Sequence, residues 1–421
     1  MKKKQVIIIG AGASGMTAAI FAARQGAKVT LLEHKDRVGK KLLSTGNGKC
    51  NLSNRKMDAS CYHSGAASFP MQVIEQFPVE QTLEFFGQLG IVLKDRNGYL
   101  YPWSGQASAV LDVLRTEVAE CGVQVVTECE VQKIQAPKSF GKANSDAPVL
   151  YQVLTNKGEF SGDALILATG SKAAPATGSD GSGYELAKRL GHHVIKPLPA
   201  LVQLRCKENF YKTISGVRTD AKIAVYANGR FLAEDTGELQ LTDYGISGIP
   251  VFQVSRFAVR ALDAGEKVTA VIDFCPELGH KRTAALLKER RERAGGRIME
   301  ELFTGWLHKK IAQLFLKLAG IRSQRPVKSL TEEEIRTLAA LIKEFETVVT
   351  GSNSFEQAQI CCGGVDVREV HARSMESKKQ KSLYLVGELL DVDGICGGYN
   401  LQWAWSTGAI AGMHAGKVNT R

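Results

Sequence analysis

VIIIGAGASGMTAAIFAARQGAKVTLLE, residues 6–33, is the stretch that decides the fold. Four apolar β-formers lead into the glycine-rich turn GAGASG, a helix of small residues follows, and a second apolar run ends on Glu33. This is the βαβ fingerprint of dinucleotide-binding proteins, which consists of a strand, a GxGxxG turn, a helix and a second strand that ends on an acid. We therefore predict an α/β, Rossmann-like fold, in which Glu33 takes the ribose hydroxyls of an ADP group.

The turn supplies the phosphate-binding part of the predicted site. Gly10 permits the tight turn, Gly12 lets the backbone approach a pyrophosphate, and Gly15 lets the helix lie close to the strand. Ala13 and Ser14 begin the helix, whose N-terminal N–H groups and dipole attract phosphates. These five residues are predicted to bind the cofactor.

Length and composition limit the possible classes of protein. The chain has 421 residues, enough for two or three domains, and 44% of them are hydrophobic, as in soluble globular proteins. No run of apolar residues is long enough for a transmembrane helix, and the basic N-terminus leads directly into the first strand, so we expect no export signal. The nine cysteines contain no CxxC pair, so no metal site is expected, and the predicted location is the cytoplasm.

The positive charge is unevenly distributed along the chain. The net charge is +11, and thirteen lysines and arginines stand against four acids between residues 280 and 328. Such clustering favours an anionic partner, for which ribosomal RNA and a CoA thioester are candidates. A solvated helix face is the competing interpretation.

A second strong motif lies between residues 387 and 402. A predicted strand at 382–386 delivers Gly387 and Glu388, and a double glycine precedes a helix predicted at 402–415. In FAD proteins with two dinucleotide folds, the acid at this place holds the ribityl chain or the pyrophosphate. The N-terminus of the helix faces the pyrimidine side of the flavin, where it stabilises negative charge. We therefore predict FAD as the cofactor.

The pattern between these motifs predicts a discontinuous FAD domain with insertions. Residues 70–120 are predicted to be mostly helical, 164–168 to form a buried parallel strand, and short β-runs to occur at 201–204, 223–226, 230–233 and 268–272. The apolar repeat at 302–318 predicts one helix face. A further strand is predicted at 124–131, a polar hairpin tip at 141–148, and a hairpin at 150–154 and 158–161. The predicted domains are 1–195 (FAD, first part), 196–278 (inserted β-barrel-like domain), 279–330 (basic helical insert), 331–356 (return through the β-rich domain) and 357–421 (FAD, second part).

The chain resembles the BaiN/RdsA family of NAD(P)/FAD-dependent flavoproteins. The resemblance rests on four blocks that span nearly the whole chain in the right order: the N-terminal fingerprint, Lys40-Lys41 through Gly46-Asn47-Gly48-Lys49-Cys50-Asn51, Leu167-Ala168-Thr169-Gly170, and Cys362-Gly363-Gly364-Val365-Asp366 through Gly397-Gly398-Tyr399-Asn400-Leu401-Gln402-Trp403-Ala404. It implies bound FAD and NADH or NADPH as the electron donor. The chain departs from the family pattern at Lys49, at Ser171 and at Asp243, where His is common.

The motifs and the resemblance together give the remaining predicted FAD contacts. These are Lys41, Ser44, Gly46, Asn47, Gly48, Cys50, Asn51, Val131, Thr169, Gly170, Gly387, Glu388, Asp391, Gly397, Gly398, Tyr399, Asn400, Leu401 and Gln402.

Flavin-dependent reduction of a polarised C=C needs a hydride on one carbon and a proton on the other. Cys50 and Tyr399 are the predicted proton donors, each with a cofactor-lining role as the alternative. His371 and Asp243 are weaker candidates.

The resemblance implies an oxidoreductase that acts on CH–CH groups. The leading hypothesis is reduction of a 3-oxo-Δ4 or Δ4,6 bile-acid intermediate, an enone with an apolar body, which would place the enzyme in steroid and lipid metabolism. The alternatives are dihydrouridine synthesis on ribosomal RNA, whose uracil has a similar conjugated bond, and oxidation of an amine such as aminoacetone. A flavoprotein without turnover that binds RNA or a partner is the hypothesis from another class.

Overall fold

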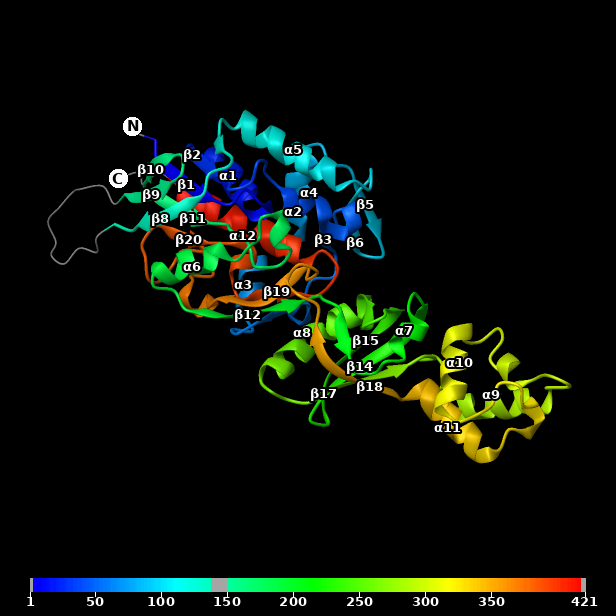
Figure 1. Ribbon diagram of the computed structural model, residues 1–421. Helices are drawn as coiled ribbons and strands as arrows, with labels where there is room; N and C mark the ends of the chain where they lie inside the picture. Colours follow the sequence, from blue (N-terminus) through cyan, green and yellow to red (C-terminus); the bar gives the residue numbers. More distant parts are fainter. Residues whose placement is uncertain (1–2, 138–149, 418–421) are drawn as a thin grey trace. The chain divides into compact units, whose positions relative to one another are not determined.

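The structure is a computed structural model that describes residues 3–137 and 150–417. The hairpin tip predicted at 141–148 lies outside the described residues. The chain divides into two compact units, which Figure 1 shows in ribbon form. Unit 1 comprises Met1–Leu198 and Gln359–Arg421, and unit 2 comprises Pro199–Ala358.

A five-stranded parallel sheet forms the centre of unit 1 (Figure 1). Its order is β20-β11-β1-β2-β7, with β1 (Gln5–Ile9), β2 (Lys28–Leu32), β7 (Gln124–Val126), β11 (Ala164–Leu167) and β20 (Leu383–Leu385). All of β11 is buried, which explains its unbroken apolar run. The strand predicted at 124–131 is wrong beyond Val126, because Glu128 has a φ of 48° that breaks the strand.

Helices α1 (Ala13–Arg24) and α12 (Tyr399–Gly416) pack against each other with their backbones in close approach. A Cβ added to Gly408, Gly412 or Gly416 would lie 2.4–2.6 Å from a backbone oxygen of α1. Those oxygens belong to Ser14, Ala18 and Ala22, which are spaced four residues apart like the glycines. The small residues of both helices therefore join two distant parts of the chain.

The other elements of unit 1 surround this framework. The helices are α2 (Lys40–Ser44), α3 (Phe69–Ile74), α4 (Val79–Gln88), α5 (Ala107–Glu120) and α6 (Ser182–Arg189). The small sheets are β8 (Val131–Gln135), β9 (Tyr151–Thr155) and β10 (Gly158–Gly162); β3 (Ser53–Asn54), β5 (Leu93–Arg96) and β6 (Tyr99–Pro102); and β4 (Tyr62–Ser64) with β21 (Val392–Gly394).

The chain leaves and re-enters unit 1 on two paired strands, β12 (Val194–Ala200) and β19 (Ile360–Val365). A Cβ on Gly363 would lie 2.4 Å from the backbone oxygen of Lys196, so the outgoing and returning strands touch.

Unit 2 contains a closed six-stranded barrel. Its order is β13-β16-β15-β14-β17-β18, with β13 (Leu204–Cys206), β14 (Arg218–Ala227), β15 (Arg230–Leu241), β16 (Gly245–Gly248), β17 (Val268–Asp273) and β18 (Phe345–Ser352). The helices of unit 2 are α7 (Tyr211–Ile214), α8 (Ile249–Asp263), α9 (His280–Glu292), α10 (Lys309–Leu318) and α11 (Glu332–Lys343).

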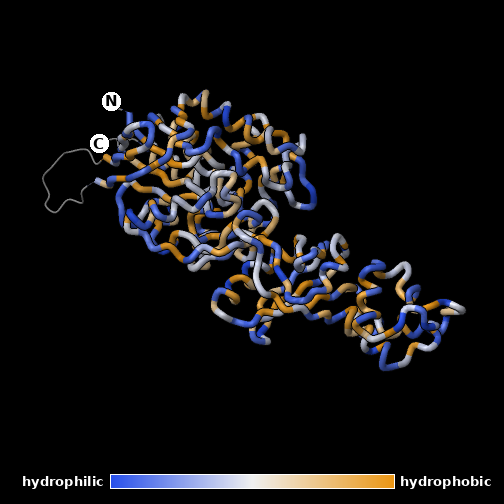
Figure 2. Tube along the Cα trace, in the orientation of Figure 1, coloured by the Kyte–Doolittle hydropathy of each residue, from blue (hydrophilic) through white to orange (hydrophobic). Residues whose placement is uncertain are grey.

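Hydrophobic and hydrophilic stretches alternate along the chain in both units (Figure 2).

The helix face predicted at 302–318 is only partly present, because α10 begins at Lys309. Gly305 has a φ of +75°, which ends regular structure, and the His308 side chain accepts a hydrogen bond from the Lys310 N–H. Helix α10 therefore begins after His308 and is separate from the turns that precede it. Leu302 and Phe303, which precede α10, are nevertheless buried, and Trp306 and Leu307 are half-buried.

Candidate functional site

The candidate site is a cavity of about 630 Å³ in unit 1. It lies where β1, β2 and β11 deliver their carboxyl ends, the place where open parallel sheets bind ligands. Both portions of unit 1 contribute, since the N-terminal glycine loop and the first turn of α12 line the same space.

The three glycines of the fingerprint occupy different surroundings. Gly10 has a φ of +98°, and a Cβ there would lie 2.4 Å from the Ala168 backbone oxygen. A Cβ on Gly15 would lie 1.9 Å from the Gly10 oxygen. In contrast, a Cβ on Gly12 would meet no atom within 4 Å and would extend into open space, and Gly12 lines the cavity. Gly10 and Gly15 therefore serve the fold, and Gly12 leaves room for a ligand.

Glu33 follows β2 and is nearly buried in the wall of the cavity. Its two carboxylate oxygens accept hydrogen bonds from the backbone N–H groups of Ala11 and Lys35, each at 2.9 Å. These contacts fix the carboxylate beside the glycine loop. A carboxylate oxygen can accept more than one hydrogen bond, so ribose hydroxyls can still be bound.

An ion pair joins the two portions of unit 1 at the cavity. The Lys41 ammonium lies 2.6 Å from Glu388 Oε2, and the Ser171 hydroxyl donates to the same oxygen at 3.0 Å. Lys41 comes from α2 and Glu388 from the turn after β20. Both line the cavity and present charge to it.

The loop before α12 contains glycines in the left-handed region, which other residues rarely adopt. Gly387 has a φ of +68°, its N–H donates to Thr407 Oγ1, and its carbonyl accepts from the Trp403 indole at 3.0 Å. Gly398 has a φ of +94° and begins α12 without a side-chain cap. The N-terminal N–H groups of α12 are therefore available to a ligand.

Asn400 fixes the same loop from the first turn of α12. Its side chain exchanges two hydrogen bonds with the backbone of Gly394, at 2.8 and 2.9 Å. Asn400 and Leu401 both line the cavity.

The predicted contacts fall into two groups. Those that line the cavity are Gly10, Gly12, Ala13, Ser14, Glu33, Lys41, Val131, Thr169, Gly170, Glu388, Asn400 and Leu401. Those that do not line it are Gly15, Ser44, Gly46, Asn47, Gly48, Cys50, Asn51, Gly387, Asp391, Gly397, Gly398, Tyr399 and Gln402. Gln402 is fully buried and bonds Ser53, Thr82 and Ser406 through its side chain.

The two predicted proton donors are buried. Burial raises the pKa of the Cys50 thiol to about 12, and burial next to Cys61 raises the pKa of the Tyr399 hydroxyl. Both groups therefore keep their proton at neutral pH. Tyr62 donates its hydroxyl hydrogen bond to the Tyr399 backbone oxygen at 2.9 Å, which holds the start of α12.

The structure adds cavity residues that the sequence did not single out. They include His34 and Arg37 after β2, and Asp180 and Arg189 around α6. Thr169 Oγ1 is buried and has no hydrogen-bond partner, and His34 Nε2 has only the Asp180 carboxylate, at 3.9 Å. A buried hydroxyl without a partner, an open position at Gly12 and two uncapped helix N-termini fit a dinucleotide. A run of glycine, serine and aspartate at 178–183 was the only sequence signal for the α6 part.

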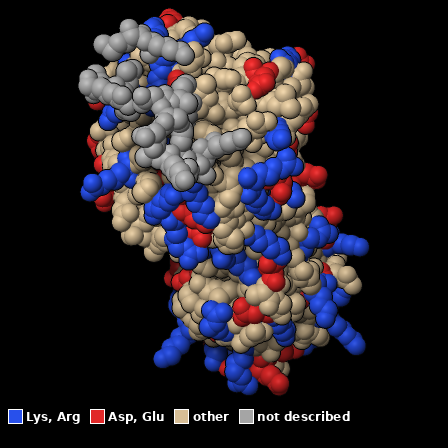
Figure 3. All heavy atoms as spheres, turned by 90° about the vertical axis from the view of Figure 1, so that its left-hand side faces the viewer, with Lys and Arg blue, Asp and Glu red and all other residues tan. Residues whose placement is uncertain are grey.

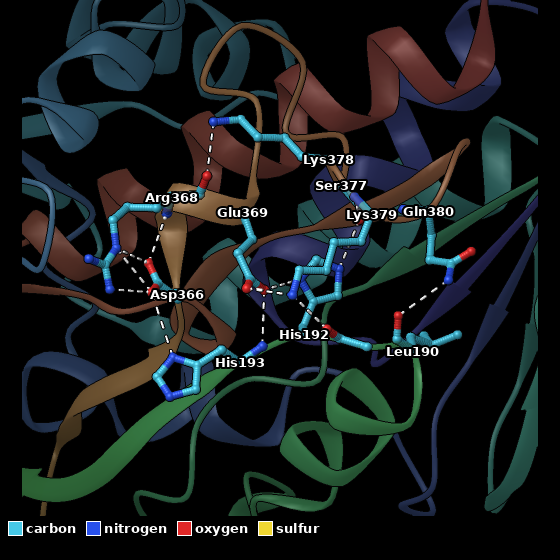
Figure 4. Close-up of polar contacts among 11 residues, drawn as sticks. Leu190, His192, His193, Asp366, Arg368, Glu369, Ser377, Lys378, Lys379 and Gln380 are labelled. Atoms are coloured by element: carbon cyan, nitrogen blue, oxygen red, sulfur yellow. Dashed lines mark hydrogen bonds and ion pairs between the residues drawn. The ribbon is translucent and has the colours of Figure 1, made fainter.

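A second polar cluster has the connectivity of a hydrolase triad (Figure 4). His192 Nδ1 lies 3.0 Å from Glu369 Oε2, and His192 Nε2 lies 2.8 Å from Ser377 Oγ. However, His192 and Ser377 are 4% and 5% exposed, and Ser377 Oγ also accepts the N–H groups of Lys379 and Gln380. The cluster therefore fastens the 377–380 turn to the end of α6 and is not placed for attack on a substrate.

The described residues contain neither a candidate metal site nor a candidate membrane span. Among them, no group of three or more His, Cys, Asp or Glu side chains could hold a metal ion. No helix within residues 3–137 and 150–417 combines the length and apolarity needed to cross a bilayer.

The fold and the cavity define a Rossmann-type FAD domain that carries an inserted barrel. The chain belongs to the family described as HI0933-like protein Rossmann domain, whose model matches residues 4–414.

Three curated relatives are similar over almost their whole length. The chain is 44% identical over 412 residues to the 3-dehydro-bile acid delta(4,6)-reductase of Clostridium scindens, covering 97% of this chain and 98% of the relative. It is 27% identical to the ribosomal RNA dihydrouridine synthase of Haemophilus influenzae, covering 95% and 96%. It is also 27% identical to the enzyme of the same name from Escherichia coli, covering 97% and 96%.

Proposed function

We propose that the protein is an FAD-dependent oxidoreductase that uses NADH or NADPH to reduce a carbonyl-conjugated C=C bond in a 3-oxo-Δ4 or Δ4,6 bile-acid intermediate. The observation that carries the proposal is the cavity in which the N-terminal glycine loop and the α12 N-terminus meet. The 44% identity to a reductase of that substrate class supports the choice of substrate.

The residues of the cavity have separate roles in this proposal. The α1 N-terminus and Gly12 hold the diphosphate, and Glu33 holds the adenosine ribose. The α12 N-terminus, through Asn400 and Leu401, faces the ring. When bound, FAD supplies hydride transfer to the β-carbon of the enone. The Lys41–Glu388 pair fixes the two halves of the site around the cofactor.

Tyr399 and Cys50 remain the proposed proton donors. Both are protonated at neutral pH because burial raises their pKa values. A Tyr399→Phe variant is expected to keep its FAD and to lose turnover. A Cys50→Ser variant tests the other candidate in the same assay.

The basic segment gives the second candidate function, dihydrouridine synthesis on ribosomal RNA. Six side chains there make no ion pair or hydrogen bond within the described part of the chain: Lys281, Arg293, Arg297, Lys317, Arg322 and Lys328. Other cations of the segment serve the fold. Arg290 donates to the backbone oxygens of Leu302 and Thr304, and Arg325 pairs with Glu334.

The face in Figure 3 carries Lys and Arg side chains with Asp and Glu among them. Mixed charge on that face gives no sign of a continuous basic field there. We favour the bile-acid substrate because the chain is 44% identical to the bile-acid reductase and 27% identical to the ribosomal RNA enzymes. All nine cysteines are free, and we place the enzyme in the reducing cytoplasm.

One anaerobic experiment separates the candidates. FAD is reduced with NADH, and its reoxidation is followed with a 3-oxo-Δ4 steroid and with unmodified ribosomal RNA in parallel. Rapid reoxidation by the steroid alone supports the proposal, and reoxidation by RNA alone overturns it. Charge reversal at Arg293, Arg297 and Lys328 is expected to leave the steroid reaction unchanged. Peroxide release that matches loss of an amine in air would instead identify an oxidase.

A further inference from the structure

The outward face of the β5–β6 hairpin carries three aromatic rings. Tyr99, Tyr101 and Trp103 alternate along β6 and the residue after it, so they share one face. Two cations of β5 lie on the same face, since Lys94 pairs with Tyr101 and Arg96 pairs with Tyr99 in the register. We call these five residues the aromatic stripe.

Two of the three rings of the stripe are open to solvent, and Tyr101 is half-buried. Trp103 is 65% exposed and Tyr99 is 41% exposed. Exposed large rings that are grouped on one surface mark an interaction site more often than single ones do. The stripe is therefore a surface that a partner molecule can cover.

Both cations of the stripe lie over rings. Lys94 Nζ is 5.3 Å from the Trp103 ring centroid, and Arg96 Cζ is 5.9 Å from that of Tyr101. In the residues that the structure describes, neither cation makes an ion pair with a carboxylate. The nearby Asp95 is bound to Arg55 at 2.6 Å and to the Gly98 N–H. The stripe therefore offers positive charge next to flat rings.

One ring of the stripe, that of Tyr99, contacts the loop that leads into α12. Strand β6 pairs with β3, and Asn54 of β3 donates to the Gly397 backbone oxygen at 3.0 Å. A Cβ on Gly397 would lie 3.0 Å from the Tyr99 ring. Tyr99 thus packs on the loop that begins α12, whose first turn lines the cavity.

We propose that the aromatic stripe docks the adenine nucleotide half of the NADH or NADPH donor. The proposal rests on the proposed function, which needs a donor beside the flavin. The chain has no second GxGxxG turn after a strand, and the cavity with the two helix N-termini is assigned to FAD. Aromatic rings stack on purines, and Lys94 and Arg96 match the charge of a diphosphate.

The size of the stripe favours a dinucleotide over a nucleic-acid strand. Three rings on one short strand span roughly 13 Å, which suits one base and its phosphates. Two cations are also few for a polyanion, whose binding depends on many phosphate contacts.

The test measures donor binding separately from substrate reduction. The variants are Trp103→Ala and the double variant Lys94→Glu with Arg96→Glu. The matched controls are Phe231→Ala, an exposed ring of unit 2, and Lys207→Glu, an exposed cation of unit 2. Stopped-flow reduction of the bound FAD under anaerobic conditions gives the apparent Kd for NADH and for NADPH.

We expect both stripe variants to weaken donor binding about tenfold or more, the scale of a lost base-stacking contact. Their FAD content, and reoxidation of the dithionite-reduced enzyme by the 3-oxo-Δ4 steroid, should stay at the wild-type level. The control variants should bind the donor like the wild type.

An unchanged donor Kd in both stripe variants overturns the proposal. So does weaker binding of a CoA thioester or of RNA with an unchanged donor Kd, since the stripe would then serve the substrate. Failure of the proposed function has a different signature. In that case the wild-type protein would bind no FAD, or its dithionite-reduced form would not be reoxidised by the enone.

Discussion

At the scale of single residues, one motif contains glycines with opposite physical roles. A side chain on Gly10 would strike the Ala168 carbonyl, whereas one on Gly12 would enter empty space. Gly12 also has a φ of −80°, which any residue adopts without strain. Stability and ligand binding can therefore be separated by two substitutions in one turn.

Gly12→Val is expected to abolish FAD binding and to leave the apoprotein stability within about 0.5 kcal/mol. Gly10→Val is expected to lower the stability of the apoprotein strongly, because of the backbone clash and the positive φ. Flavin absorbance per chain and thermal unfolding of both apoproteins measure the two effects. An apoprotein of Gly12→Val that unfolds as early as that of Gly10→Val would contradict this division.

The contribution of the Lys41–Glu388 ion pair to stability can be measured with a double-mutant cycle. We expect Lys41→Met and Glu388→Gln to show a coupling energy of about 1 kcal/mol in the unfolding of the apoprotein, because both side chains are only one-fifth exposed. The Lys188–Glu185 pair on α6, whose side chains are 50% and 63% exposed, should show almost none. Equal coupling in the two cycles would refute a special role for the cavity pair.

Sequence motifs were sufficient to predict those candidate site residues that offer a ligand their backbone or a single carboxylate. Gly12, Glu33 and Glu388 belong to this group. His34 and Arg189 also line the cavity, but neither belongs to a sequence motif that indicates a ligand. Gln402 follows a glycine loop in the sequence, yet its side chain turns into the core, which only the helix phase of α12 determines.

At the scale of elements, close packing holds together α1 and α12, whose N-terminal residues both line the cavity. Gly412→Ala is expected to destabilise the protein by about 1–3 kcal/mol, because its Cβ would lie 2.4 Å from the Ala18 oxygen. Gly87→Ala in α4 is the matched control, since a Cβ there meets nothing within 4 Å. It is expected to stabilise by about 0.5–1 kcal/mol. Chemical denaturation with the two variants side by side measures both changes, and similar destabilisation by both would contradict the packing argument.

Helix α11 begins with a capping box whose stability depends on pH. Hydrogen bonding to Arg325 is the main cause that lowers the pKa of Glu334 from 4.5 to about 2. A depressed pKa stabilises the folded state above about pH 4.5, and that stability is lost as the pH falls toward 2. Glu334→Gln should therefore cost about 2 kcal/mol at pH 7. The cost should shrink to near zero by about pH 2. Urea unfolding at several pH values tests this, and a cost that is independent of pH would contradict it.

Elements with an unbroken apolar run or a strong period were predictable, as the strands of the parallel sheet illustrate. The predicted helix face at 302–318 begins too early. Apolar residues continue at helical spacing through residues 302–308, although the backbone there forms turns before α10 begins. The spacing of apolar residues indicates which side chains are buried. It does not reveal where the helix is interrupted, which depends on the positive φ of Gly305.

At the scale of the whole molecule, the chain splits into units that connect through paired strands. The finer division at residues 279–330 and 331–356 stays a prediction. We expect residues 199–358 to fold when produced alone, because they contain a closed barrel with its own buried core. A cooperative thermal transition and dispersed amide NMR signals would support this, and a spectrum typical of an unfolded chain would contradict it.

The contact between the outgoing strand β12 and the returning strand β19 also has an evolutionary consequence. Because the outgoing and returning strands pair with each other, an ancestor could lose, lengthen or exchange the segment between them without rebuilding the nucleotide fold. Substrate preference could thus diverge among descendants while the redox chemistry was inherited intact. Transplanting the segment between the bile-acid and ribosomal RNA enzymes would reveal how much of that divergence travels with it.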